Sequence, residues 1–210
     1  RQDTLDTLVF STFTTLDTLF MVNPGFIPKP KFDTLEVLAN GDLYMKIDAG
    51  AAGTTGEFRF FDGTIAPGNL LGSIIKPTYE LTLTNQNYQL NPANIVIQGL
   101  DECDSNTRAN SAVYQTFIPT GGFPADPCAG VYDLSWIKPT GFPNGVRGYR
   151  IYRRDRDAGA PAYSNWELVR TITNANTLTA SMPIRANADF IYKVVAYDQE
   201  QAVIISAEHQ

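Results

Sequence analysis

The sequence predicts an all-β protein that contains two antiparallel β-sandwiches in tandem. From Leu43 onward, apolar residues recur with the two-residue period of β-strands or form short runs. Clusters of glycine, proline, asparagine and aspartate separate these runs, and the connections are too short for the crossover helices of a parallel sheet. The length of 210 residues matches two sandwiches of roughly 100 residues each, and each unit is large enough to bury its own core.

The apolar pattern predicts a series of short strands in each half of the chain. In the first half we expect strands at Leu35–Leu38, Leu43–Ile47, Glu57–Phe61, Tyr79–Thr84, Ile95–Gln98 and Ala112–Ile118. In the second half we expect them at Val131–Ile137, Gly148–Arg153, Glu167–Ile172, Leu178–Met182, Phe190–Tyr197 and Ala202–Ile205. The stretch from Pro119 to Pro127 has the highest density of turn-forming residues, so we expect one sandwich in residues 24–120 and the other in residues 121–210.

Residues 1–23 form a separate segment in which the tripeptide Asp-Thr-Leu recurs. It begins at Asp3, Asp6 and Asp17, and again beyond the segment at Asp33. The apolar residues could share one helical face, but the many threonine, phenylalanine and valine residues favour an extended strand. The backbone groups of a lone strand would stay unpaired, so we expect this segment to pair with a sheet edge. That edge belongs either to the same molecule or to a neighbouring copy, which would make the segment a site of self-association.

Charge and hydropathy argue against two classes of partner. The chain carries 16 Lys and Arg residues against 22 Asp and Glu residues, which gives a formal net charge of −6. A nucleic-acid-binding surface needs clustered positive charge, so we expect no nucleic-acid partner. No apolar run approaches the ~20 residues that cross a bilayer, so we expect no membrane span. Residue 1 is Arg rather than Met, and we expect the numbered chain to be a processed or excised piece of a longer one.

The polar residues form no recognisable catalytic motif. His209 is the only histidine and stands next to the last residue, where chain ends usually fray. Ser-His-Asp and Cys-His mechanisms both need a positioned imidazole. Asp101, Glu102 and Asp104 could offer oxygens to Ca²⁺, but they lack the spacing of an EF-hand and are more typical of a solvated turn. Paired carboxylates could still perform glycoside hydrolysis, but the chemistry depends on the distance between them, which a sequence does not give. We expect a protein that is not an enzyme, with no catalytic residue, cofactor or metal.

The two cysteines and two aromatic residues are the remaining candidate site residues. Cys103 and Cys128 lack the C-x-x-C spacing of a zinc or redox site, and they flank the segment rich in glycine and proline. We expect them to form a disulfide across the junction of the two sandwiches, in an oxidising compartment. Tyr163 and Trp166 lie near an expected sheet edge, which makes them the better candidates for a surface contact among the aromatic residues of the second half.

The second half resembles a fibronectin type III domain over about residues 125–208. Leu134-Ser135-Trp136 is similar to the second strand of that family, in which a Trp fills the core between the sheets. Gly148–Arg153, Trp166–Val169 and Phe190–Ala196 are similar to the third, fourth and sixth strands, and Ser206 to the end of the seventh. Phe190 departs from the family, which usually has a Tyr at this place whose hydroxyl pins the corner.

The first half resembles the immunoglobulin-like repeats of large secreted and gliding-associated surface proteins of Bacteroidota. The matching segments are Glu57–Asp62, Gly68–Ser73 and Cys103–Arg108, although the family more often has Trp-Tyr in place of Phe60-Phe61. Asp-Thr followed by an apolar residue also resembles the O-glycosylation acceptor of that phylum. This implies modification at Thr4, Thr7, Thr18 and Thr34, whereas the alternative is that the repeat is an ordinary strand edge.

The resemblances imply a non-catalytic structural or adhesive module of an extracellular cell-surface protein or surface filament. Its partners would be other protein subunits or cell-surface components. Two other classes stay open, because a fold alone does not fix a function. One is a structural protein of a virion, such as a capsid decoration or fibre. The other is an accessory domain of a secreted glycan-active enzyme.

Overall fold

The computed structural model describes residues 27–48, 55–84, 87–102, 108–126 and 130–210. Within these ranges the elements are strands and one short 3₁₀ turn at Pro67–Asn69, which confirms the all-β expectation. No helix in the described part of the chain has the length and apolar character needed to cross a membrane. Cys103, Cys128, Thr4, Thr7 and Thr18 lie outside the described residues.

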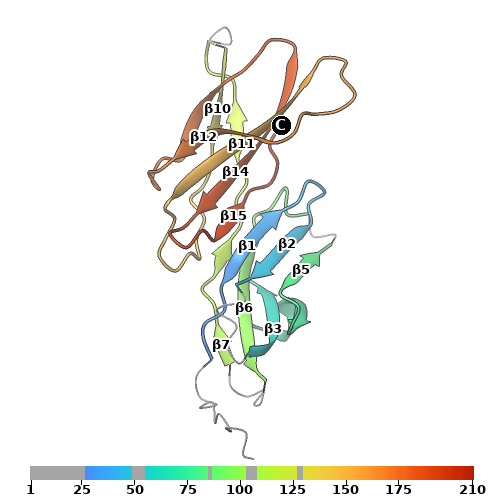
Figure 1. Ribbon diagram of the computed structural model, residues 1–210, viewed down its shortest axis with the longest axis vertical. Helices are drawn as coiled ribbons and strands as arrows, with labels where there is room; N and C mark the ends of the chain where they lie inside the picture. Colours follow the sequence, from blue (N-terminus) through green and yellow to red (C-terminus); the bar gives the residue numbers. More distant parts are fainter. Residues whose placement is uncertain (1–26, 49–54, 85–86, 103–107, 127–129) are drawn as a thin grey trace, which may run out of the picture.

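The first lobe comprises strands β1 to β8 (Figure 1). One sheet has the order β1-β2-β5, and the other has the order β4-β3-β6-β7, with β8 also paired to β6. The two sheets bury Phe32, Met45, Phe58 and Ile97 in the core between them, because inward-facing and outward-facing residues alternate along each strand. The strands are β1 (Phe32–Val37), β2 (Leu43–Ile47), β3 (Thr55–Asp62), β4 (Leu70–Ile75), β5 (Glu80–Leu83), β6 (Asn94–Asp101), β7 (Arg108–Asn110) and β8 (Tyr114–Gln115).

The second lobe comprises strands β9 to β15 and repeats the strand order of the first. In each lobe the first, second and fifth strands form one sheet, and the fourth, third, sixth and seventh strands form the other. Here these sheets are β9-β10-β13 and β12-β11-β14-β15. The strands are β9 (Thr120–Gly122), β10 (Val131–Ser135), β11 (Gly148–Asp157), β12 (Glu167–Ile172), β13 (Thr179–Pro183), β14 (Ala188–Tyr197) and β15 (Val203–Ile205).

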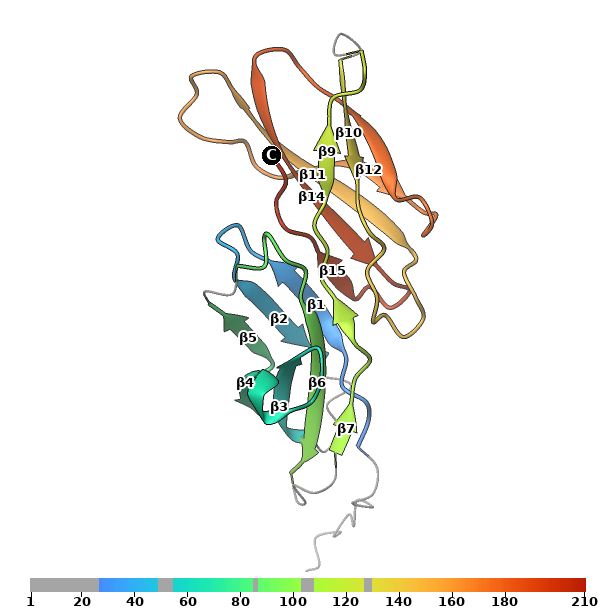
Figure 2. The same cartoon turned by 180° about the vertical axis from the view of Figure 1, so that it is seen from behind.

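A single sheet passes from one lobe into the other. Strand β15 pairs in parallel with β1, with Thr34 opposite Val203 and Glu36 opposite Ile205. The result is a seven-stranded sheet of order β12-β11-β14-β15-β1-β2-β5. Both ribbon views show this sheet passing from one lobe to the other along the long axis of the molecule (Figures 1 and 2). Short connections predict antiparallel pairing only between strands that follow one another, so they gave no indication of this parallel pair.

Trp136 lies in the core of the second lobe, as the sequence predicts. Its side chain is 5% exposed, and its ring meets that of Tyr149 edge-on at 5.2 Å between centroids. Trp136 follows β10 and Tyr149 belongs to β11, so this contact joins the two facing sheets. The hydrophobic cluster that contains Trp136 also contains Phe32 and Met45 of the first lobe, so the two lobes share one core.

Three regions differ from the expectation by more than the bounds of a strand. Residues Leu70–Ile75 form β4, which the sequence did not indicate because Leu70 and Ile75 face outward and are 48% and 69% exposed. Of the expected strand Ala112–Ile118, only β8 at Tyr114–Gln115 forms, and a separate short strand, β7, precedes it. Strand β9 begins at Thr120 inside the stretch that predicts turns, and the boundary expected after residue 120 stays a prediction.

Gly121 explains why a strand carries turn-forming residues. A Cβ atom at this position would lie 2.4 Å from Cε1 of Tyr132, so a glycine lets β9 approach the neighbouring strand β10. Gly121 therefore reflects close packing of a strand rather than a turn.

Candidate functional site

The junction between the two lobes is the candidate functional site, because backbone pairing, packing and ion pairs meet there. Asp198 organises the segment that leads into β15. Its side chain is 1% exposed, and Oδ1 accepts hydrogen bonds from the backbone N–H groups of Glu200 (2.9 Å) and Ala202 (3.0 Å). This turn fixes the start of β15 and presents Glu200 to the first lobe.

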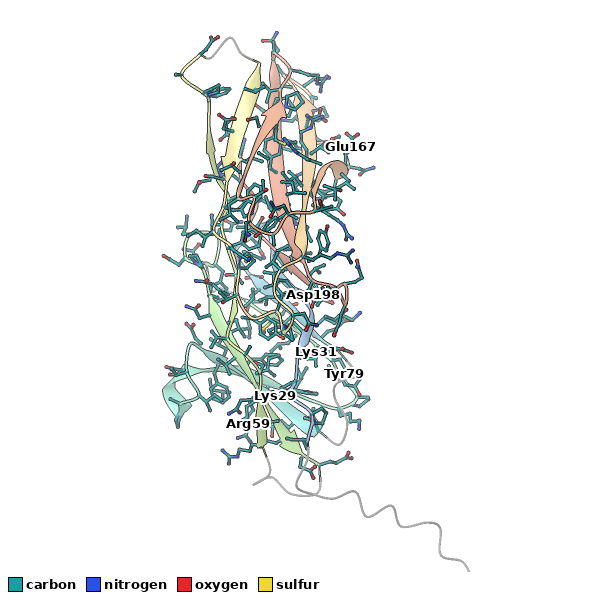
Figure 3. All side chains as sticks on the ribbon, turned by 90° about the vertical axis from the view of Figure 1, so that its left-hand side faces the viewer. Lys29, Lys31, Arg59, Tyr79, Glu167 and Asp198 are labelled. Atoms are coloured by element: carbon teal, nitrogen blue, oxygen red, sulfur yellow. The ribbon has the colours of Figure 1, made fainter. Side chains whose placement is uncertain are left out.

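Lys31 of the first lobe receives Glu200. Its Nζ contacts the Glu200 carboxylate and also lies 3.2 Å from Oδ2 of Asp48. The hydrogen bond to Glu200 is the main reason that the pKa of Lys31 is raised, so this amine stays charged. Figure 3 shows Lys31 and Asp198 near one another at the waist between the lobes.

Lys193 makes a second ion pair across the junction. Its Nζ on β14 lies 2.8 Å from Oε1 of Glu36 on β1, and the side chains of Lys193 and Glu36 are only 14% and 21% exposed. Lys193 also lies 3.7 Å from Oε1 of Glu208, whose other oxygen pairs with Arg154 at 2.7 Å. A charged hydrogen bond that is largely shielded from water is stronger than an exposed ion pair, so Lys193 ties the two lobes together.

Tyr114 and Gly141 fill the other side of the junction. Tyr114 is 2% exposed and packs edge-on against Phe32 at 4.8 Å between ring centroids. Burial raises the pKa of Tyr114 to about 12, so its hydroxyl is neutral. Gly141 has φ +105°, and a Cβ there would lie 2.6 Å from Cα of Tyr114. Only glycine suits both the backbone angle and the contact, and the Gln115 N–H donates to the Thr140 carbonyl at 3.2 Å beside it.

The sequence did not identify this junction. Its one local signal is Lys193, a charged residue inside the apolar run Phe190–Tyr197 of a buried strand. A charge at such a position usually has a specific partner, because an unpaired buried ion is costly. The partner Glu36 could not be read from the sequence, since it lies 157 positions away.

Tyr163 and Trp166, the expected surface contacts, lie against the second lobe and are half-buried. The Cζ atom of Arg154 lies 5.2 Å from the Tyr163 ring and 4.9 Å from the Trp166 ring. Arg156 also covers Tyr163 at 4.6 Å, and Lys193 covers Trp166 at 5.1 Å. Each such contact stabilises the fold by about 0.5–1 kcal/mol at an exposed site. A role of these rings in binding a partner stays a prediction.

The remaining expected site residues have mixed outcomes. Thr34 lies in β1 between its neighbours β15 and β2, and its glycosylation stays a prediction, as do the disulfide and the modification of the other threonines.

His209 does not lie in a frayed chain end, so the expectation for this residue was wrong. Its backbone N–H and C=O bond to Tyr192 at 3.0 and 2.8 Å, which adds the chain end to the sheet. Within the described ranges, no group of three His, Cys, Asp or Glu residues could hold a metal.

Comparisons with known proteins found similarity among solved structures. No family model matches the sequence, and no curated protein matches it either. Among solved structures, the chain is similar to fibronectin(III)-like modules of CbhA from Clostridium thermocellum, with 11% sequence identity and a TM-score of 0.32. The likeness covers 86% of this chain and 90% of that one. No argument about function rests on a similarity this low.

Proposed function

We propose that this chain is a non-catalytic structural module of an extracellular cell-surface protein or surface filament, in which the two lobes act as one stiff spacer. The observation that carries the proposal is the parallel pairing of β15 with β1, which makes one seven-stranded sheet out of two sandwiches. Tandem domains usually move relative to one another unless their interface is large and apolar.

The junction supports stiffness in three ways. Bending one lobe against the other would separate the backbone hydrogen bonds between β1 and β15. It would also pull Glu36 from Lys193 and Lys31 from Glu200. The shared hydrophobic core would open as well, and exposing apolar surface costs about 25 cal/mol for each Å². A spacer of this kind would hold a binding or catalytic domain at a fixed distance from a surface.

The extracellular location is tested by labelling intact cells that produce the parent protein. A reagent that cannot cross membranes, such as a sulfonated biotin ester, should label the parent protein on intact cells while a cytoplasmic marker stays unlabelled. Labelling only after lysis would overturn the location. Co-purification with virus particles would replace the proposal with a virion structural protein. A catalytic domain in the same reading frame would favour an accessory domain of an enzyme.

A further inference from the structure

The two lobes share a strand order, and this leaves a matching pair of strand edges unpaired. At the junction, the first strand of the first lobe, β1, pairs with the seventh strand of the second lobe, β15. The reciprocal pair is β9, the first strand of the second lobe, and β7, the seventh strand of the first lobe. Each of these two strands ends its sheet, and its outer edge pairs with no other strand in the described ranges.

The unpaired edges of β7 and β9 are placed so that two copies of the chain can meet end to end. Figure 2 shows β7 at the lower end of the first lobe and β9 in the upper part of the second lobe. Strand β7 has three residues, Arg108–Asn110, and β9 has three residues, Thr120–Gly122. The ladder between β1 and β15 also has three residue pairs. Parallel pairing of β9 with β7 of a second copy would therefore repeat the existing junction in length and direction.

A groove of about 530 Å³ lies on the outer face of the sheet beside the unpaired edge of β9. Asp133 is the one charged residue among the described residues that line it. Asp133 is exposed, its Oδ1 accepts a 2.5 Å hydrogen bond from the Ser181 hydroxyl, and it makes no ion pair with any described residue. Gly122 lies opposite Asp133 on β9, and a Cβ at Gly122 would meet no atom within 4 Å. The carboxylate is therefore open to a cation that approaches from this edge.

Strand β7 carries the complementary charge. Arg108 is exposed, and in the part of the chain that the structure describes it has no ion-pair partner. It is the first residue of a strand whose burial alternates from exposed to half-buried to exposed, so its side chain points outward. In the β1–β15 pair, buried Leu35 lies opposite buried Ile204, so the outer faces of the two strands are continuous. The same alternation would place Arg108 of a second copy on the outer face beside the groove that holds Asp133.

We propose that the chain associates end to end with further copies of itself, through parallel pairing of β9 with β7 of the next copy and an ion pair between Asp133 and Arg108 of that copy. The contact joins two different surfaces, so it does not close into a dimer and each copy can add another. An acidic partner would not suit the groove, because Asp133 would repel it. The inference goes beyond the spacer function, because it names the contact between copies, and it does not depend on where the protein is located.

The test is sedimentation velocity of the full chain from about 10 μM to about 1 mM, a range that covers weak association. The parent should form oligomers that extend beyond the dimer as the concentration rises. Arg108→Asp alone and Asp133→Arg alone should each weaken association by about tenfold or more, because each brings like charges together at every contact. An equimolar mixture of these two variants should restore oligomers of the parent's size. Every contact between unlike variants again joins an arginine to an aspartate.

Arg147→Asp serves as the matched control, because Arg147 is exposed, makes no ion pair in the described residues and does not line the groove. It changes the net charge as Arg108→Asp does, and it should associate like the parent. Arg108→Glu with Asp133→Lys repeats the exchange if either first variant loses the circular dichroism spectrum of the parent.

Three results would overturn the proposal. The first is a parent that stays monomeric at about 1 mM or stops at a dimer. The second is association of the single variants that equals that of the parent, because another surface, such as the edge of β4, would then join the copies. The third is a mixture of two folded variants that associates no better than either variant alone.

Discussion

Removing the ion pair between Glu36 and Lys193 should destabilise the protein by an amount that a double-mutant cycle measures. The variants are Glu36→Gln, Lys193→Met and the combination of both. The Nζ–Oε1 distance of 2.8 Å and the low exposure of both side chains make this a charged hydrogen bond rather than a surface ion pair. Hydrogen bonds to charged groups contribute about 1.5–3 kcal/mol, and partial access of water reduces this. We expect a coupling free energy of about 1–2 kcal/mol.

The free energy of unfolding is measured in urea by linear extrapolation, with circular dichroism and tryptophan fluorescence as separate probes. Because the lobes share a core, the two probes should show one coincident transition. Lys193→Met alone should cost more than Glu36→Gln alone, since it leaves Glu36 without its cation and also removes one of the two cations beside Glu208.

The control pair for this cycle is Arg156 and Asp189, which also joins two strands but lies within the second lobe and is 34% and 48% exposed. Exposed pairs contribute little, so its coupling should not exceed about 0.5 kcal/mol. The reasoning is refuted if the coupling between Glu36 and Lys193 is no larger than that of the control pair.

Three further predictions concern the core, the cysteines and the N-terminal segment. Trp136→Ala should lower the free energy of unfolding by about 3–5 kcal/mol, because it leaves a cavity between two sheets, and a variant that melts like the parent would contradict the core position. Mass spectrometry without reductant should find Cys103 joined to Cys128, a loop closure worth about 3 kcal/mol on the chain-entropy model, whereas two alkylatable thiols would rule it out. Deleting residues 1–23 should abolish self-association if the segment donates a strand to a neighbouring copy, and an intact chain that stays monomeric at high concentration would exclude that exchange.

Local patterns predicted the strands whose side chains alternate between core and solvent. Strand β2 matches its expected range of Leu43–Ile47, and every second residue in it is buried. The pattern did not identify β4, because its apolar ends face outward at a sheet edge, or β9, because Gly121 is there for its close approach to β10. In each case the contacts of the folded chain, rather than the local period, decided which residue occupies the position.

The junction could not be predicted from local patterns for a different reason. Strands β1 and β15 lie near opposite ends of the chain, and Lys31 and Glu200 are 169 positions apart. Periodicity shows that a segment is a strand and which of its faces is buried, but it carries no information about which distant strand lies beside it. The continuous sheet and its ion pairs are therefore properties of the tertiary fold.

The most direct test of the stiff junction is ¹⁵N relaxation of the backbone amides in both lobes. If the seven-stranded sheet joins the lobes into one rigid body, a single elongated diffusion tensor will fit the relaxation rates of both lobes, and the amides of β1 and β15 will show no nanosecond motion of their own. Separate tensors with shorter correlation times for each lobe would contradict the account, because they would mean that β1 and β15 do not hold the lobes together in solution.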